Sequence, residues 1–412
     1  MYKNFKRGEV QIMCNSHDVP ENMRESKLPK PKVFESGRED GRFTGSSGFI
    51  YAYLKHMKPK LEYKPGMARE EFFEWREKLR EKLFELMCFP EFEEEQPPCK
   101  MLWSEPREGY SLQKWEIYPE PYSVVPFLVI VPDGVSAASP APGVLCFPGS
   151  FSSKESLCGE LELDGSVCSH KWFAYNQMAL EYGRAGFVSV AVENPATNEV
   201  SDSLCPDSYE FSVHSMWAGR CYESISVYQK YMILQWLKKQ PFVDASRLGT
   251  SGHSLGAKPA AILGILDPDV KAVVWNDGIG YWRKRAYSTN LFRIGTFQYI
   301  PGLLRWFDYP DILAALAPAH LCISEGGAVE VLDIIQTAFE TAGVPEHYEY
   351  HFYPKYEDPA NRLYDYAPMP EGMTQEECYA YGNCDAPTHR FRGVHAVPFL
   401  SKILKPTHKI NP

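Results

Sequence analysis

The stretch Arg247–Gly264, RLGTSGHSLGAKPAAILG, decides the fold of this chain. A short strand-like run leads into a Gly-x-Ser-x-Gly pattern made by Gly252, Ser254 and Gly256, and a helix-forming run follows. A strand, this pattern and a helix are together typical of a turn so tight that only glycine fits beside the serine. The turn lifts the serine hydroxyl above the sheet. The sequence therefore predicts a nucleophilic Ser254, and the alternative is a glycine-rich connection with an inert serine.

Strand-like and helix-like segments alternate on both sides of this turn. Short apolar runs indicate buried parallel strands, and the alternation with helices indicates a mostly parallel sheet covered on both faces. The expected parallel strands are VLCFPG, FVSVAVEN, RLGTSG, AVVWND and HLCISEG, preceded by an antiparallel pair, YSLQKWEIYP and SVVPFLVIVP. The expected helices are 69–87, 171–184, 215–239, 255–266, 330–342 and 393–404.

One large α/β domain is expected at residues 66–412, after an N-terminal arm at 1–65. Two loop-rich, lid-like insertions interrupt the domain at about 278–315 and 354–386. The polar arm leaves open a homo-oligomer in which it packs on a neighbouring subunit.

The overall charge argues against a nucleic-acid partner. The 412 residues include 43 basic and 53 acidic side chains, a net charge of −10, whereas binding to phosphates requires a basic surface. The first residues, MYKNFKRGEVQIMCNS, contain no apolar core of a signal peptide, and SVVPFLVIVP is too short to cross a bilayer. We therefore expect a cytoplasmic protein without membrane contact.

Eleven cysteines occur without any Cys-x-x-Cys pair. This spacing favours reduced thiols over a structural zinc site. Cys88, Cys146 and Cys322 lie in apolar stretches and are expected to be buried. No metal site and no cofactor are predicted.

A serine nucleophile needs a base, and on this kind of fold the histidine follows the final strand. His389, in DAPTHRFRG, lies in the loop before the last expected helix, whereas His395 lies within that helix. Because a loop can lean over the sheet edge, His389 is the expected base and His395 the alternative. His253, inside the turn, points the wrong way to serve its neighbour and is expected to be a packed side chain.

The base in turn needs a carboxylate that orients the imidazole. Asp277 ends AVVWND, 23 residues after Ser254, at the edge where the strands end. Glu330 and Glu325 follow the later strand HLCISEG and are the alternatives. A plainer role for Asp277 is to cap the turn that follows it.

An acyl-transfer reaction also needs donors to the developing oxyanion. The backbone N–H of Leu255, directly after Ser254, is one expected donor. The other is expected in the loop after VLCFPG, at Ser150 or at Phe151, where Gly149 lets the backbone turn sharply.

Several longer stretches carry a family resemblance, namely PGVLCFPGSFSSKESLCGE, NQMALEYGRAGFVSVAVENP, GHSLGAKPAAILGILDPDVKAVVWND, DILAALAPAHLCISEGG, FETAGVPEHYEYHFYP and DAPTHRF. From about residue 65 onward the chain resembles the α/β-hydrolase superfamily, and within it the acetyl-xylan-esterase-like branch near the dienelactone-hydrolase-like proteins. The resemblance implies an α/β-hydrolase fold and hydrolysis of small carboxylic esters such as acetylated sugars.

The chain departs from that family pattern at two positions. Pro148 replaces the histidine that usually precedes Gly149, and Val329 stands where the family usually has its acid. The second departure favours Asp277, a placement that the similar glucuronoyl esterases use with a glutamate. Lys258 resembles a sugar-contacting lysine of those esterases, but Leu255 stands where they have an arginine.

Residues and resemblance together predict a serine ester hydrolase acting on a small-molecule substrate. Ser254 attacks the acyl carbon, His389 carries the proton to the leaving alcohol, Asp277 or Glu330 orients His389, and water releases the acyl group. Two alternatives stay open. The same residues carry another acyl chemistry (glucuronoyl esterase, lactonase, peptidase or acyltransferase), or the fold is catalytically inactive and serves only for binding.

Overall fold

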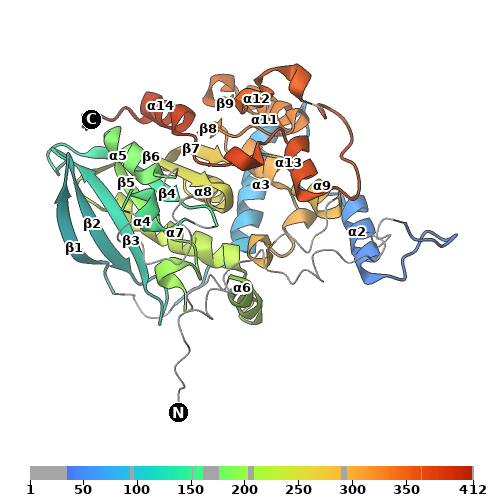
Figure 1. Ribbon diagram of the computed structural model, residues 1–412, viewed down its shortest axis with the longest axis horizontal. Coiled ribbons are helices and arrows are strands. Elements are labelled where there is room, and N and C mark those ends of the chain that lie inside the picture. Colours follow the sequence, from blue (N-terminus) through green and yellow to red (C-terminus); the bar gives the residue numbers. More distant parts are fainter. Residues whose placement is uncertain are drawn as a thin grey trace, which may run out of the picture.

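The computed structural model describes residues 35–92, 97–150, 152–160, 176–202, 208–288, 295–362 and 364–410. Its centre is a nine-stranded sheet in the order β1-β2-β3-β5-β4-β6-β7-β8-β9 (Figure 1). The strands are β1 Lys100–Arg107, β2 Tyr110–Ile117, β3 Val125–Pro132, β4 Ala141–Phe147, β5 Val188–Val192, β6 Val243–His253, β7 Val270–Asn276, β8 His320–Ile323 and β9 Tyr348–Tyr350.

The first three strands and the junction of β3 with β5 are antiparallel. All pairs from β5 through β4 to β9 are parallel. Strands β3 and β4 are buried at every position, as near-continuous apolar runs covered on both faces should be. The carboxyl ends of the parallel strands meet at one edge of the sheet, and the segments that follow β6, β7 and β8 there carry Ser254, Asp277 and Glu325.

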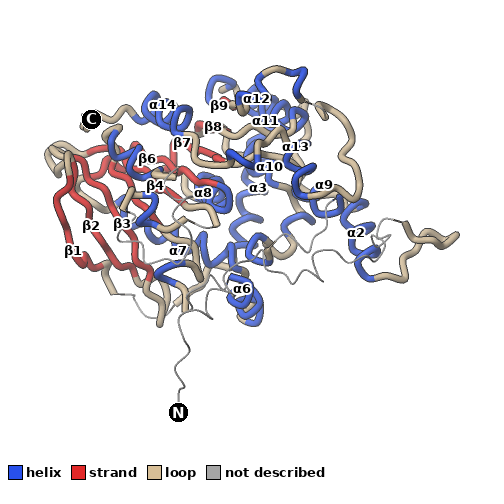
Figure 2. Tube along the Cα trace, viewed as in Figure 1, coloured by secondary structure: helices blue, strands red, loops and turns tan. Residues whose placement is uncertain are grey.

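Helices cover both faces of the sheet (Figure 2). One apolar core includes side chains of α3, α7, α8, α10 and α11, and the other includes side chains of α5 and α14. The α-helices are α2 Ser46–His56, α3 Arg69–Met87, α4 Lys154–Leu157, α5 Met178–Arg184, α6 Ser208–Trp217, α7 Tyr222–Lys238, α8 Ala257–Leu266, α9 Trp282–Ser288, α10 Tyr309–Ala314, α11 Val329–Ala342, α12 Pro354–Glu357, α13 Gln375–Tyr381 and α14 Gly393–Leu404. The prediction of a mostly parallel sheet between two helical layers is confirmed.

Helix α3 illustrates how sequence pattern becomes packing. Its buried residues, Phe72, Trp75, Leu79, Leu83 and Met87, recur every three or four positions and therefore lie on one face. That face packs into the core beside α7, α8 and α11. The helix has the bounds that the periodicity predicts, 69–87.

The long helix expected at 215–239 is two helices, α6 and α7, so this prediction is wrong. The chain leaves α6 at Gly219, which adopts a positive φ of 73° that an extended helix does not allow. Cys221 then starts α7, since its sulfur accepts a hydrogen bond from the N–H of Ser224. The break redirects α7 across the sheet.

The described part of the N-terminal segment packs on the first insertion. Helix α2 contacts α9, and the N–H groups of Lys60 and Leu61 donate to the carbonyls of Arg305 and Trp306 at 3.1 and 2.6 Å. Helix α2 was not predicted, because it has no side-chain N-cap and exposes several of its apolar residues. Residues 1–34 lie outside the described residues, and the domain boundary at 65 stays a prediction.

No helix in the described ranges is both long enough and apolar enough to cross a membrane.

Candidate active site

Ser254 sits on a strained turn between β6 and α8. Its φ of 53° is in the left-handed region that residues other than glycine rarely adopt. The glycines on both sides are required by space. A Cβ on Gly252 would lie 1.9 Å from the carbonyl oxygen of Gly256, and a Cβ on Gly256 would lie 2.4 Å from that of Phe147. Ser254 is partly exposed while its neighbours are buried, so the turn leaves the serine accessible and buries the residues that hold the turn in place.

A histidine–carboxylate pair lies next to this turn. The Nδ1 atom of His389 is 2.6 Å from Oε2 of Glu325, which is completely buried. Glu325 follows the end of β8, and His389 lies in the loop before α14. The ring of His253, the residue before Ser254, packs against that of His389 at a tilt of 35°, with centroids 4.5 Å apart. His389 therefore reaches the serine turn from its loop.

Two further donors fix the Glu325 carboxylate. The Asn276 amide donates to its Oε1 at 2.5 Å, and the Tyr353 hydroxyl donates to its Oε2. Asn276 is itself held, because its Oδ1 accepts from the Ser324 hydroxyl at 2.6 Å. A buried carboxylate with this many donors stays in one orientation.

The structure corrects the expected partner of His389. The expected first choice, Asp277, accepts a hydrogen bond from the N–H of Gly278 at 2.9 Å, in its own turn. Glu330 forms an ion pair with Lys284 at 3.0 Å, at the start of α11. Neither is hydrogen-bonded to His389 among the described interactions, because both carboxylates are engaged locally. The partner is Glu325.

The alternative base also lies elsewhere. His395 is on α14, where its ring stacks on that of His351 with centroids 3.9 Å apart. Because His351 follows β9 near Glu349, His395 faces the far end of the sheet edge and not the serine turn. His253 is a buried, packed side chain, as the sequence predicts.

The charges at the site favour a protonated His389 beside a neutral His253. Burial lowers the pKa of His389, but the charge and hydrogen bond of Glu325 outweigh burial and raise this pKa to about 9; Asp277 adds a smaller contribution. Burial holds the pKa of His253 well below its usual value, and the charge on His389 lowers it further. The His389–Glu325 pair can therefore take up a proton, and His253 does not compete for it.

The loop after β4 runs directly against the serine turn. A Cβ on Gly149 would lie 2.8 Å from Nδ1 of His253 and 3.4 Å from Cβ of Ser254. Ser150 follows Gly149 and Leu255 follows Ser254, so the two expected oxyanion donors are on adjoining backbone segments. Phe151, the alternative donor, lies outside the described residues.

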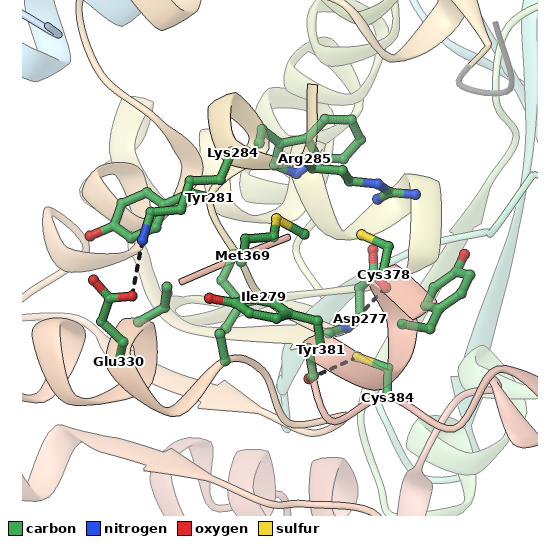
Figure 3. A pocket seen from close by; sticks show the side chains of 17 residues that line it. Asp277, Ile279, Tyr281, Lys284, Arg285, Glu330, Met369, Cys378, Tyr381 and Cys384 are labelled. Carbon is green, nitrogen blue, oxygen red and sulfur yellow. Dashed lines mark hydrogen bonds and ion pairs between the residues drawn. The ribbon is translucent and has the colours of Figure 1, made fainter. Parts of the chain in front are cut away.

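A small pocket opens beside Asp277 (Figure 3). Both insertions contribute to its wall, since Trp282 and Arg285 come from the first and Tyr379 and Cys384 from the second. The Arg285 guanidinium lies 5.0 Å from the Trp282 ring centroid and 5.8 Å from that of Tyr379. The wall thus combines aromatic faces with a cation beside Asp277, and its lining does not include Ser254, His389 or Glu325.

Lys258, one turn into α8 from Ser254, is a second buried cation near the site. Its Nζ donates to Oε1 of Gln298 at 3.1 Å and lies 4.0 Å from the Trp282 ring centroid. Burial lowers its pKa to about 8, against the raising effect of Glu223 and Asp277. The first insertion therefore packs on the nucleophile helix.

Among the residues that the structure describes, two groups of side chains have the composition of a metal site. His253, Glu325 and His389 form one, and Cys322, Glu349 and His351 the other, with the ligand atoms of each group within 4.8 Å of one another. In the first group the carboxylate is already bonded to His389, and in the second the Nε2 of His351 is 3.1 Å from Oε1 of Glu349. Hydrogen bonding within each group accounts for its arrangement.

Comparison with known proteins agrees with this fold. The Abhydrolase family model Abhydrolase_7 matches residues 27–402, so the chain belongs to the α/β-hydrolase family. The predicted α/β-hydrolase fold is confirmed.

One similar solved structure comes from Bacteroides fragilis NCTC 9343 and has a provisional assignment as an acetyl xylan esterase. It is 33% identical over 90% of this chain and 98% of that chain, with a TM-score of 0.84. Methylesterase BT1017 is 13% identical over 88% of this chain and 70% of that chain, with a TM-score of 0.57. A glucuronoyl esterase from Solibacter usitatus is 13% identical over 85% and 99%, with a TM-score of 0.54. These last two share the fold. No curated protein matches.

Proposed function

We propose that this protein is a serine ester hydrolase in which Ser254, His389 and Glu325 form the catalytic triad. The observation that carries the proposal is the 2.6 Å bond between His389 and buried Glu325, beside a serine held at a positive φ. Strain at a residue other than glycine persists only where the surroundings enforce it, and it concentrates at active sites.

The chemistry follows from the charges. His389 takes the proton of the Ser254 hydroxyl as its oxygen attacks the acyl carbon, and Glu325 stabilises the resulting imidazolium. The backbone N–H groups of Leu255 and Ser150 receive the oxyanion. His389 then donates the proton to the departing alcohol, an acyl–serine ester remains, and water, deprotonated by His389, releases the acid.

Small esters, with acetylated sugars first among them, are the proposed substrates. Support comes from the 33% identity to the Bacteroides fragilis protein over nearly the whole of both chains. The aromatic and cationic side chains around the pocket, such as Trp282 and Arg285, suit a sugar ring or a polar leaving group.

The test is a Ser254→Ala variant assayed on nitrophenyl acetate and on acetylated xylo-oligosaccharides. We expect the activity to fall by roughly 10³-fold or more, and a fluorophosphonate probe to stop labelling the protein. Ser251→Ala is the matched control, since Ser251 lies three residues earlier on β6 and its buried Oγ only accepts from Tyr182. If the Ser254→Ala variant still hydrolysed these esters at the rate of the unaltered enzyme, the proposal would be wrong.

The alternatives differ in what they release. An acyltransferase or lactonase gives other products from the same labelled serine, which competition with alcohol acceptors reveals, and an inactive binding protein gives no fluorophosphonate adduct. A cytoplasmic location and a homo-oligomer formed through the arm stay predictions from the sequence, for cell fractionation and analytical ultracentrifugation to measure.

A further inference from the structure

A buried asparagine holds the backbone of the loop that carries the second proposed oxyanion donor. Asn194 follows the end of β5, beside β4 in the sheet, and is 1% exposed. Its Nδ2 donates to two consecutive carbonyls, those of Pro148 at 3.0 Å and Gly149 at 3.3 Å. One side chain thus fixes two successive peptide units directly after β4.

Because the peptide unit is planar, this contact also sets the direction of the proposed oxyanion donor. The carbonyl of Gly149 and the N–H of Ser150 belong to one peptide unit, and in a trans unit they point in opposite directions. When Asn194 holds that carbonyl, the N–H of Ser150 must face away from Asn194. Gly149 packs against Ser254, so the opposite side of this peptide is where the substrate oxygen would lie.

A buried lysine decides which way the Asn194 amide faces. The Nζ of Lys230, on α7, donates to Oδ1 of Asn194 at 3.2 Å, to the carbonyl of Glu193 at 3.3 Å and to Oγ of Ser226 at 2.6 Å. The two loop carbonyls can only accept, so the NH₂ group of Asn194 faces them. The amide oxygen then faces Lys230, which donates to it.

Lys230 is fully buried, and this makes a purely structural role costly. Burial lowers its pKa to about 7 against the raising effect of Glu223 and Glu193. An apolar side chain of similar volume would avoid the desolvation. The polar contacts of Lys230 are with Ser226 on its own helix and with Glu193 and Asn194 after β5, and the contact with Oδ1 of Asn194 orients this amide.

We propose that Asn194 is a positioning residue for the oxyanion hole, held in orientation by Lys230, and that it aims the N–H of Ser150 at the carbonyl oxygen of the substrate. This inference rests on the proposed esterase function. It concerns a charge that develops during attack, so its loss acts on the transition state more than on substrate binding.

The experiment compares Asn194→Ala and Lys230→Met with the unaltered enzyme, with active sites counted by fluorophosphonate labelling. Loss of a complete oxyanion donor costs about 10²–10³-fold in kcat, and a donor that is present but misaligned costs less, so we expect a fall of roughly 10- to 100-fold in kcat with KM changed less than about threefold. The affinity for a trifluoromethyl ketone that forms a tetrahedral adduct with serine should fall by the same factor as kcat/KM.

Thr197→Val is the matched control. Its hydroxyl donates to the backbone carbonyl of Asn194 at 2.7 Å, so the variant loses a buried hydrogen bond of the same residue without touching the loop carbonyls. We expect its kcat to stay within about threefold of the unaltered enzyme. Asn194→Ser, which retains a donor at reduced reach, replaces Asn194→Ala if circular dichroism shows that the latter does not fold.

The inference is overturned if folded Asn194→Ala keeps its kcat, or if Thr197→Val loses as much as Asn194→Ala, or if KM rises while the ketone still binds as tightly. These outcomes differ from a failure of the proposed function. If the proposed function is wrong, Ser254→Ala stays active. If only the role of Asn194 is wrong, Ser254→Ala is inactive and Asn194→Ala keeps its activity.

Discussion

Replacing Glu325 by glutamine tests the proposed acid most directly. The variant is nearly isosteric and keeps one oxygen, which can accept from Asn276 or from Tyr353 but not from both, and it lacks the negative charge 2.6 Å from Nδ1 of His389. The pKa of His389 is raised from 6.5 to about 9. That difference of about 2.5, at about 1.36 kcal/mol for each tenfold change in proton affinity, corresponds to about 3 kcal/mol in favour of the imidazolium.

The imidazolium forms as Ser254 attacks, so most of this free energy is lost from the transition state. We expect kcat to fall by roughly 100- to 300-fold, and by up to about 10⁴-fold if the wrong tautomer of His389 adds its own cost. His389 is active as a base only when it is neutral. The activity of the unaltered enzyme should therefore rise with pH toward about 9. In the Glu325→Gln variant the carboxylate no longer offsets the effect of burial, so the pKa of His389 falls. The rise of activity with pH then occurs at lower pH.

The assay is kcat and kcat/KM for nitrophenyl acetate from about pH 5 to 10, with rates corrected for spontaneous hydrolysis. Asp277→Asn removes a charge that also raises the pKa of His389 but makes no hydrogen bond to it, so we expect a loss below about tenfold. Glu330→Gln breaks only the pair with Lys284 and should stay within about threefold. The reasoning is refuted if Glu325→Gln keeps its activity and pH profile, or if Asp277→Asn is the more damaged variant.

Two other predictions concern the turn and the thiols. Gly252→Ala should lower the free energy of unfolding by several kcal/mol, seen as a large drop in Tm, because its Cβ would lie 1.9 Å from the carbonyl oxygen of Gly256; a Tm within about 2 °C of the parent would contradict it. Iodoacetamide should modify exposed Cys88 well before Cys146, whose pKa is raised well above its usual value by complete burial, and peptide mass spectrometry after short exposures measures the order.

The serine turn could be predicted from the sequence because its cause is local. Gly252 and Gly256 are needed by contacts with backbone atoms on β4 and within the turn itself, and such needs appear as a fixed spacing in the chain. The same holds for α3, whose buried stripe is a periodic pattern. Where a structural feature depends on a few residues close together in the chain, their spacing is sufficient to predict it.

The acid could not be chosen from the sequence because its choice depends on distant partners. Asp277, Glu325 and Glu330 all follow strand ends at the same edge of the sheet, and spacing alone does not rank them. Asn276 and Tyr353, which fix the Glu325 carboxylate, come from 49 residues before it and 28 residues after it. Glu325 lies two residues after β8 and Asp277 directly after β7, so distance from a strand end does not single out Glu325.

Other errors have physical causes of the same kind. Cys88 was expected to be buried but is exposed, because it ends α3 in the left-handed conformation, beyond the last buried residue of the helix. Gly219 was read as an ordinary helical position, although its positive φ ends α6. Single residues at helix ends depend on backbone conformation more than on hydrophobicity.

Three lysines buried near the carboxyl edge of the sheet connect these observations. Lys154 and Lys230 are 0% exposed and Lys258 is 2% exposed, and burying an ammonium group costs several kcal/mol unless polar partners compensate. Lys154 is paired with buried Glu193, Lys230 orients Asn194, and Lys258 contacts the first insertion. Lys154 and Lys258 lie on the helices that follow β4 and β6, and Lys230 reaches the residues after β5 from α7. A fold stabilised by apolar packing alone would gain nothing from this arrangement, whereas a reaction that develops charge at the same edge needs dipoles and charges fixed there in advance.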